Sequence, residues 1–380
     1  MASTPASGAP SGVPPSERLV SLDALRGFDM LWIAGADSLG EALNHFNGGP
    51  AGRFMARQLD HVPWAGLHFY DVVFPLFVFL MGVAIPYSLS RMVEVSGRPA
   101  AIRRILRRSA LLVLLGIFYY GGLAHPFSDI RWLGVLQRFG LCYLGAGILY
   151  LYVRPRGLAA TCAALLVGYW LLMRFVPVPG VGAGNFEEGK NLSNWIDRMY
   201  LPGRKWDGAW DPEGILSTLP AVASCLLGIF AGNCLRDGRL SPARKAAVLA
   251  GMGAALLAVG LAWAVPFPVI KKLWTSSFVL VTGGISALAL AGFYLVIDVW
   301  RIRAWAAPFV WVGANALTVY LLSNIVDFGA LARRFTGGTV TAWLDTVRPG
   351  LSGVTEALVS IALCFAVAGF LYRRKIFLRL

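Results

Sequence analysis

Long apolar runs separated by short polar segments repeat along almost the whole chain. About ten of these runs reach the roughly 20 residues that a helix needs to cross the hydrocarbon core of a bilayer. The pattern predicts an all-α polytopic membrane protein, a single bundle of about ten transmembrane helices. The predicted spans lie near residues 24–43, 68–90, 105–123, 133–153, 157–176, 214–235, 243–265, 274–298, 305–327 and 353–373.

Composition supports this class of protein. The chain is 57% hydrophobic and only 14% charged, whereas a soluble domain carries about 25% charged residues. The formal net charge of +14 is typical of loops that face anionic lipid, so we expect a lipid bilayer and no nucleic acid as partner. The cysteines lack metal-ligand spacing, so we expect buried apolar side chains and no metal site. They are Cys142, Cys162, Cys225, Cys234 and Cys364.

The first 17 residues are rich in Pro, Ser, Gly and Ala. They lack the charged start and apolar core of a signal peptide, and their composition is typical of a disordered segment. We therefore expect residues 1–17 to form a short disordered cytoplasmic tail and residues 18–380 to form one transmembrane domain. The first apolar helix would then act as an uncleaved insertion signal.

The charge of the loops alternates along the chain. If ten spans are counted, four basic loops and the C-terminal tail fall on one side, and the positive-inside rule places both termini in the cytoplasm. The basic groups are Arg91, Arg98, Arg103 and Arg104; Arg154 and Arg156; Arg236, Arg239, Arg244 and Lys245; Arg301 and Arg303; and Arg373, Arg374 and Lys375.

The opposite side carries a long extracytoplasmic loop over about residues 176–213, rich in Gly and Pro and dense in Trp and Asp. Long loops without regular structure are often functional. Trp195, Trp206 and Trp210 could form stacking platforms for sugar rings, or they could belong to the aromatic belt at the membrane interface. Both interpretations stay open at this point.

The segment HVPWAGLHFYDVVFPLFVFLMG, from His61 to Gly82, leads from polar residues into an apolar run. Asp71 lies inside the predicted helix, where a carboxylate is costly unless it is paired or faces a wet cavity. His61 lies just outside the helix, where a general base could meet a water-borne substrate. Asp37 approaches the same level from the first span and could hold the imidazole, as the orienting acid does in a triad. The alternative is that His61 is an inert surface histidine.

Several basic side chains enter the predicted spans. Arg131 starts the fourth span, and Gln137 and Arg138 follow about two turns inward. An Arg at this depth needs an anion or a carboxylate partner, for which Asp71, Asp29 or a bound phosphate could serve. In the first span, Arg26 could simply pair with Asp29, three residues on.

At the predicted cytoplasmic face, Arg108 lies near the start of the third span, and Arg374 and Lys375 follow the last one. Such clusters suit the binding of a polyphosphate. They could equally mark the cytoplasmic side and contact lipid. The chain has no phosphate-binding glycine fingerprint, so a phosphorylated ligand would depend on these side chains.

Five motifs follow one another along the chain: SLDALRGFDMLW, HVPWAGLHFYDVVFPLFVFLMG, IRWLGVLQRFGLCYL, WDPEGILSTLP and YRRKIF. Together they resemble the heparan-alpha-glucosaminide N-acetyltransferase family, and the resemblance runs from about Arg18 to the C-terminus. It implies transfer of an acetyl group from cytosolic acetyl-CoA to a glucosamine amine across the membrane. The catalytic histidine of the family stands in an HxxWxGL motif that maps onto His61, and an Asn or Asp late in its first shared helix maps onto Asp37.

The chain departs from the family pattern in two ways. It lacks the N-terminal luminal domain and the helix that follows it, and it has Ala65 where the lysosomal enzyme has Asn. The resemblance therefore implies the donor more strongly than the acceptor. The compact form suggests a bacterial source, for which we expect the inner (cytoplasmic) membrane and an acceptor other than heparan sulfate.

The combined hypothesis is a transmembrane acyltransferase that moves acetyl from cytoplasmic acetyl-CoA, a co-substrate, to an amine or hydroxyl of an extracytoplasmic sugar or glycan. The expected catalytic residues are His61, Asp37 and Asp71, with His61 as general base or acetyl carrier. The expected donor-binding residues are Arg108, Gln137, Arg138, Arg374 and Lys375, and the expected acceptor-binding residues are Trp64, Arg131, Trp210, Asp211 and Glu213.

Two other classes of function compete with this hypothesis. One is a transporter of an anionic solute with Arg138 and Asp71 as gating charges, although the sequence lacks the internal repeats that many transporters carry. The other is a membrane scaffold without chemistry. A homodimer is one assembly that we consider for any of these classes.

Overall fold

The computed structural model describes residues 19–46 and 48–378, and helices account for all the regular structure in these residues. The predicted tail 1–17 lies outside the described residues. The α-helices are α1 (Val20–His45), α2 (Gly49–Gln58), α3 (Phe69–Tyr119), α4 (Val135–Tyr152), α5 (Pro155–Phe175), α6 (Leu192–Tyr200), α7 (Thr218–Arg236), α8 (Pro242–Trp263), α9 (Ser276–Tyr294), α10 (Ala307–Ala314), α11 (Ala316–Ile325), α12 (Phe328–Thr336), α13 (Thr339–Val347) and α14 (Leu351–Arg373). The shorter elements are η1 (Gly122–Ala124), η2 (Phe127–Asp129), η3 (Lys271–Leu273), η4 (Leu295–Val299) and η5 (Ala304–Ala306).

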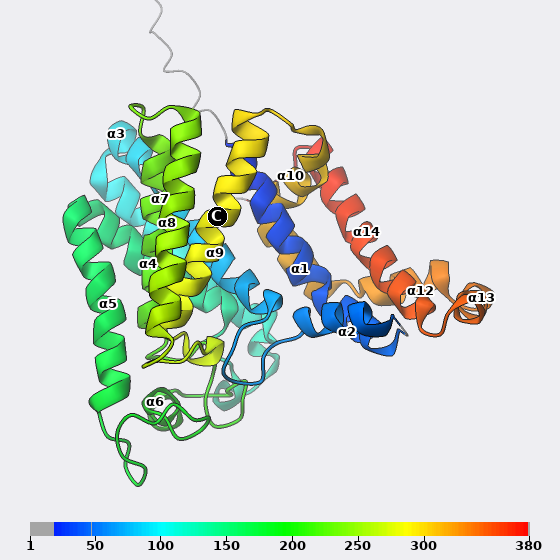
Figure 1. Cartoon of the computed structure of the whole chain (residues 1–380), viewed down its shortest axis with the longest axis horizontal. Coiled ribbons are helices and arrows are strands. Elements are labelled where there is room, and N and C mark those ends of the chain that lie inside the picture. Colours follow the sequence, from blue (N-terminus) through cyan, green and yellow to red (C-terminus); the bar gives the residue numbers. More distant parts are fainter. Residues whose placement is uncertain (1–18, 47, 379–380) are drawn as a thin grey trace, which may run out of the picture.

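The long helices form two groups that lie side by side in Figure 1. In the larger group α3 packs against α4 and α7, and α8 packs against α9. In the smaller group α1 packs against α10 and α14, and its contacts with α3 and α9 join the two groups. The predicted all-α architecture is confirmed.

Within the described residues, seven helices are long and apolar enough to cross a membrane, or eight if the pair Ala304–Ala314 and Ala316–Ile325, bent by 69°, counts as one broken span. α1 is not among them because it carries several charged residues, including Asp23, Arg26 and Asp29. Several membrane spans are therefore supported, and the number ten and the orientation stay predictions.

Two of the predicted spans, 68–90 and 105–123, lie in the single 51-residue helix α3. The basic segment between them, predicted as a loop, is helical except at Gly97, whose φ is 79°. Glycine adopts positive φ without a Cβ penalty, and Pro99 just beyond it cannot donate a helical hydrogen bond. α3 is therefore two helices that meet at a break, which lets its second half turn away from the first.

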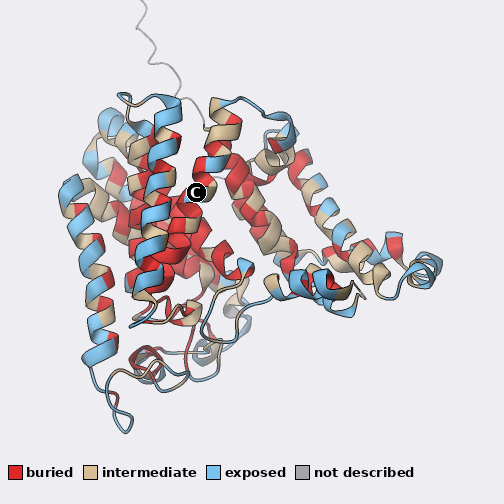
Figure 2. Cartoon of the chain, viewed as in Figure 1, coloured by how far each residue is buried: buried red, intermediate tan, exposed pale blue. Residues whose placement is uncertain are grey.

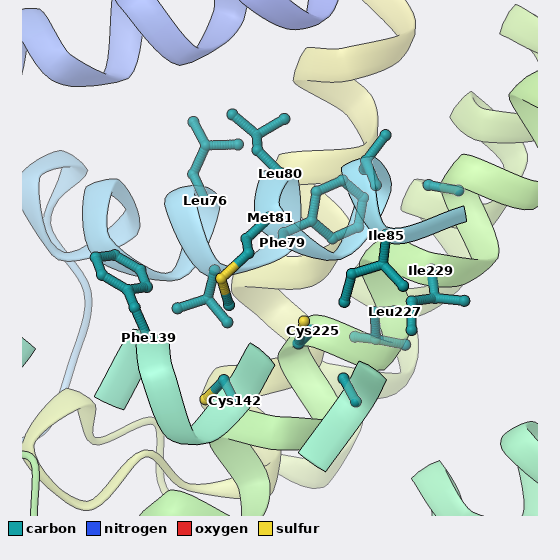
Figure 3. Close-up of a cluster of buried hydrophobic side chains, with 14 of the residues drawn as sticks. Leu76, Phe79, Leu80, Met81, Ile85, Phe139, Cys142, Cys225, Leu227 and Ile229 are labelled. Atoms are coloured by element: carbon teal, nitrogen blue, oxygen red, sulfur yellow. The ribbon is translucent and has the colours of Figure 1, made fainter. Parts of the chain in front are cut away.

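The core of the larger group holds α3 against α4 and α7 at close range (Figure 3). A Cβ on Gly82 of α3 would lie 2.0 Å from the carbonyl oxygen of Cys225 in α7, and a Cβ on Gly228 would lie 2.0 Å from that of Phe79. Small residues at a helix crossing are the packing that membrane bundles favour, since they let backbones approach. As predicted, the cysteines are free apolar side chains, all buried except the half-buried Cys234.

The outward faces of α5 and α8 are exposed, as Figure 2 shows. Their exposed side chains include Leu171 and Leu172 on α5 and Val248, Val259 and Leu261 on α8. An apolar face of this size in contact with water would be unfavourable. Contact with lipid explains it.

The two ends of the bundle differ in the loops that they carry. The α7–α8 and α9–α10 loops lie at the upper end of Figure 1, whereas α6 and the long loop around it lie at the lower end. That loop, predicted to lack regular structure, contains α6, which Asn191 caps by accepting a hydrogen bond from the backbone N–H of Asn194. The separation agrees with the loop charges that underlie the predicted topology.

The first prediction tests this topology by cysteine labelling. Ala183 and Gly238 are exposed loop residues at opposite ends of the bundle, and a Cβ at Gly238 meets no atom within 4 Å. In a Cys234→Ser background, Ala183→Cys should react with a membrane-impermeant maleimide in intact cells, and Gly238→Cys should react only after permeabilisation. Labelling of both positions from the same side would exclude the predicted arrangement.

Candidate active site

A cavity of about 710 Å³ lies between α1, the two halves of α3, α4 and the α10–α11 pair. On the first half of α3, the residues that line the cavity run from Tyr70 to Ala84, a length of about 21 Å at 1.5 Å per helical residue. His61, Asp37 and Lys271 line it, and so do Arg104 and Arg108 from the second half of α3. One cavity therefore connects the predicted catalytic histidine with one of the predicted donor-binding arginines.

Asp71 holds His61 at the start of α3. The Asp71 side chain is only 1% exposed, and its Oδ1 lies 2.8 Å from Nδ1 of His61. Its Oδ2 accepts hydrogen bonds from the backbone N–H groups of His68 (3.0 Å) and Val62 (3.3 Å). An ionised Asp71 accepts the Nδ1–H of His61, which leaves Nε2 as the ring nitrogen that can take up a proton.

The contacts of the His61 imidazole differ from the prediction that Asp37 holds it. The imidazole is held by Asp71, not by Asp37, because the loop before α3 folds back over the first turn of that helix. Asp37 instead interacts with the Tyr70 hydroxyl, and the Tyr70 ring stacks on His61 with a centroid separation of 4.5 Å. Tyr70 thus lies between Asp37 and the imidazole of His61, and the catalytic role of Asp37 stays a prediction.

Lys271, which the sequence motifs did not predict, lies beside His61. Its Nζ is 2.9 Å from Nδ1 and 3.0 Å from Nε2 of the ring, and 3.4 Å from Oδ1 of Asp71. Burial lowers the pKa of Lys271, and the Asp71, Glu213 and Asp37 carboxylates oppose that shift only in part. The sequence signal was a pair of lysines on the side of the membrane that the positive-inside rule expects to be poor in them.

Arg131 is neutralised by the long loop. Its Nε and Nη2 donate to Asp211 at 2.8 and 2.7 Å, and Nη2 also donates to Glu213 at 2.6 Å. The rings of Tyr120 and Trp206 lie 4.4 and 4.9 Å from its guanidinium carbon. Burial raises the pKa of Glu213. Arg131 thus ties the start of α4 to the loop before α7.

Only some of the predicted acceptor residues reach the cavity. Arg131 and Glu213 line it, while Asp211 is buried behind them. Trp64 donates its indole N–H to the Phe186 carbonyl at 2.9 Å and meets the buried Trp210 edge to face. Trp64 and Trp210 thus pack the long loop together, and their role in acceptor binding stays a prediction.

Gln137 and Arg138 are buried away from the cavity lining. Gln137 donates to the Arg131 carbonyl at 3.1 Å. Arg138 donates to the Ser217 hydroxyl and to the Gly214 carbonyl, and its guanidinium carbon lies 4.9 Å from the centre of the Trp274 ring. Its Nε and Nη1 are buried without a hydrogen-bond partner. The carboxylates predicted as its partners are wrong, since Asp71 binds His61 and its flanking backbone and Asp29 has no hydrogen-bond partner. Donor contact by Gln137 and Arg138 stays a prediction.

At the other end of the cavity, the Nε atoms of Arg104 and Arg108 are buried without a hydrogen-bond partner. The Arg108 guanidinium carbon lies 4.6 Å from the centre of the Tyr143 ring. Arg374 and Lys375 do not line the cavity, but Leu378, three residues beyond Lys375, does. α14 packs chiefly on α1, α12 and α10. The C-terminal segment, rather than α14 itself, therefore reaches the cavity.

Two further expectations concern single residues. Arg26 pairs with Asp23 at 3.4 Å, and both carboxylate oxygens of the buried Asp29 lack a hydrogen-bond partner, so the predicted Arg26–Asp29 pair is wrong. In the described part of the chain, no group of three or more His, Cys, Asp or Glu side chains is arranged to hold a metal ion.

Two curated enzymes are similar in sequence to this chain. Heparan-alpha-glucosaminide N-acetyltransferase from Homo sapiens is 27% identical in an alignment that covers 98% of this chain and 61% of the relative. The enzyme of the same name from Mus musculus is 26% identical over 83% of this chain and 56% of the relative. The resemblance to the heparan-alpha-glucosaminide N-acetyltransferases is confirmed.

A family model described as "Domain of unknown function (DUF5009)" matches residues 18–176, which include His61, Asp71 and the two cavity arginines of α3. The chain spans 61% or less of the length of the two N-acetyltransferases that it matches. Lys271 lies outside the matched family segment.

The second prediction concerns the Arg131 cluster. Arg131→Met should lower the free energy of unfolding by about 3–5 kcal/mol, because it leaves two buried carboxylates without their counter-charge. Chemical denaturation in detergent micelles would measure the loss. Lys190→Met, which removes an exposed ion pair with Glu187 in the same loop, should leave the midpoint unchanged. An Arg131→Met variant as stable as the wild type would contradict the structural role assigned to this cluster.

Proposed function

We propose that this protein is a transmembrane acyltransferase that moves an acetyl group from cytoplasmic acetyl-CoA to an amine or hydroxyl of an extracytoplasmic sugar. The observation that carries the proposal is the shared cavity, with the His61–Asp71 pair at one end and Arg104 and Arg108 at the other. The names of the two curated relatives support the reaction class.

The donor would enter from the end where the two arginines of α3 lie. Their partnerless Nε atoms suit the phosphates of CoA, since guanidinium groups bind phosphate through charge-assisted hydrogen bonds. The stripe of Phe74, Phe77 and Met81 on α3 lines the middle of the cavity. It would accommodate the pantetheine arm and bring the thioester toward His61.

The acceptor would enter from the opposite end, past the long loop. Trp206, Tyr120 and Glu213 line the cavity there, and an aromatic surface beside a carboxylate suits a sugar ring that carries an amine. His61 Nε2 would take the proton of the attacking amine or hydroxyl, while Asp71 stabilises the imidazolium that forms. An acetyl-His61 intermediate is the alternative course of the same reaction.

The transporter hypothesis fits the geometry less well. Arg138, one of its two gating charges, is buried against Ser217 and Trp274 and does not line the cavity. Purified protein in proteoliposomes, incubated with isotope-labelled acetyl-CoA and a panel of aminosugars, separates the two classes. Mass spectrometry should detect labelled acetyl on an acceptor and free CoA. Solute uptake without CoA release would support the transporter instead.

The third prediction concerns the base. His61→Ala should lower kcat by about 10²–10⁴-fold, the usual contribution of a general base, while acetyl-CoA binding measured by calorimetry stays near that of the wild type. Asp71→Asn should also lower kcat, because the imidazolium loses its counter-charge. Asp37→Ala should have a smaller effect than either, since Asp37 contacts Tyr70 and not the imidazole. Near-normal turnover by His61→Ala would exclude the assigned chemistry.

The fourth prediction concerns the donor site. Arg108→Ala should raise the KM for acetyl-CoA about tenfold or more, since a charge-assisted hydrogen bond contributes about 1.5–3 kcal/mol and each decade of affinity is about 1.4 kcal/mol. The KM for the acceptor should barely change. Arg107→Ala is the matched control, because its neighbouring guanidinium is exposed and does not line the cavity. Equal donor KM values for the two variants would contradict a role of Arg108 in donor binding. Arg108 would then only mark the cytoplasmic side of the membrane or contact lipid.

Lys375→Ala addresses the C-terminal segment in the same assay. If Lys375 binds the donor beside Arg108, Lys375→Ala should raise the KM for acetyl-CoA by a factor similar to that of Arg108→Ala. A dephospho-CoA donor should then lose part of the same binding energy in the wild type and less in the variant. An unchanged KM would limit the donor site to the arginines of α3.

A further inference from the structure

We propose that Lys271 is a second catalytic residue, whose ammonium group binds the oxyanion that forms from the thioester carbonyl during acetyl transfer. The proposal rests on the function proposed above and adds a group that the histidine motif does not contain. Lys271 lines the cavity beside His61, from a loop 210 residues further along the chain.

The loop that carries Lys271 is held rigidly. Ile270 and Leu273 on either side are buried, and the backbone N–H of Ile270 donates to the Thr275 hydroxyl at 3.1 Å. Gly66, in the loop that carries His61, donates its N–H to the Val269 carbonyl at 2.9 Å. The two loops are therefore paired, and their pairing sets the ammonium beside the ring before a substrate binds.

The balance of charge favours this role. The proposed mechanism starts from a carboxylate at Asp71 and an ammonium at Lys271, whose charges cancel beside the imidazole. Attack on the thioester creates one new positive charge, on the imidazole, and one new negative charge, on the carbonyl oxygen. Asp71 already faces the first through Nδ1. Lys271 lies 3.0 Å from Nε2, and in the proposed mechanism its ammonium turns from the ring to the second. A pair of fixed charges that matches the charges of the transition state is the arrangement that lowers a barrier most.

The step can be written in full for direct transfer. The acceptor nitrogen or oxygen forms a bond with the acetyl carbonyl carbon, and the proton of the acceptor passes to Nε2 of His61. The carbonyl π electrons move to the carbonyl oxygen, and Lys271 binds the oxyanion that results. When the oxyanion collapses, the carbon–sulfur bond breaks and the imidazolium proton passes to the departing CoA sulfur. The products are the acetylated acceptor and CoA thiol, with His61 and Lys271 restored.

A purely structural role for the lysine explains the contacts less well. Asp71 already accepts hydrogen bonds from two backbone N–H groups and holds the imidazole, and Lys271 adds only a longer 3.4 Å contact. The next residue, Lys272, shows what a structural lysine does here, since it pairs with Asp207 at 3.0 Å and lies over the Trp210 ring. Lys271 turns instead toward the reacting centre.

The test compares Lys271→Met, Lys271→Arg and the control Lys190→Met. Lys271→Met should lower kcat by about 10²–10³-fold, the usual effect of removing one oxyanion donor, with little change in the KM for acetyl-CoA. Lys271→Arg keeps the charge and should recover part of that loss. Lys190→Met removes an exposed lysine that does not line the cavity and should keep kcat within about threefold of the wild type, well below the loss of an oxyanion donor.

The pH profile gives a second readout. The groups that face Lys271 are His61, Tyr70, Asp71, Asp37 and Glu213. Since burial lowers the pKa of Lys271, the ammonium is lost at a lower pH than in an ordinary lysine, and kcat should fall on the alkaline side as it deprotonates. Arginine stays protonated there, so Lys271→Arg should keep its activity to higher pH. An identical alkaline limb in both proteins would count against the proposal.

Isotope-edited infrared spectroscopy of bound ¹³C-carbonyl acetyl-CoA separates this proposal from the proposed function. In the wild type the carbonyl stretch should move to lower wavenumber than in free acetyl-CoA, and in Lys271→Met it should return toward the free value. Acetyl transfer with an unchanged stretch and unchanged kcat in Lys271→Met would overturn the role of Lys271 and leave the acyltransferase intact. Failure of the wild type to bind acetyl-CoA would overturn both.

Discussion

The buried carboxylate of Asp71 is the group on which the site depends. It lies in the first turn of α3, where backbone N–H groups lack helical partners and the helix end favours an anion. There it binds the backbone of the preceding loop and the imidazole of His61 at once. The donors replace the water that a buried carboxylate would otherwise need. A single ionised group thus folds the loop over the helix and orients the base.

The helices were largely predictable because the thickness of a bilayer sets their length, and a run of apolar residues is a local signal. The exceptions have local physical causes. The basic segment before Gly97 is helical because nothing in it forbids a helix until that glycine. The span predicted over 305–327 is broken at Asn315 and bends by 69°. Hydropathy averaged over 18 or more residues cannot register one residue of irregular backbone.

The site was predictable only where its residues are close in the sequence. His61 and Asp71 are ten residues apart and span the start of one helix, so the motif brings them together. The choice between Asp37 and Asp71 as the partner of His61 depended on how a short loop folds back, which no periodic pattern encodes. Likewise, Arg131 finds its carboxylates 80 and 82 residues further on, and Lys271 approaches His61 from another loop. Such pairs arise from tertiary packing alone.

The charge on the cavity wall has a consequence for the membrane itself. Six cationic side chains and two carboxylates line the cavity. In the proposed reaction a long donor enters from one compartment and a sugar from the other, and such a passage risks leaking protons and metal cations down their gradients. Four of these cations lie within 4 Å of a carboxylate, so the excess positive charge lies at Arg104 and Arg108. There it raises the energy of any small cation, as the charged rings of ion channels do. The two arginines that are proposed to attract a polyanionic donor would therefore also limit the leak of small cations through the cavity during the reaction.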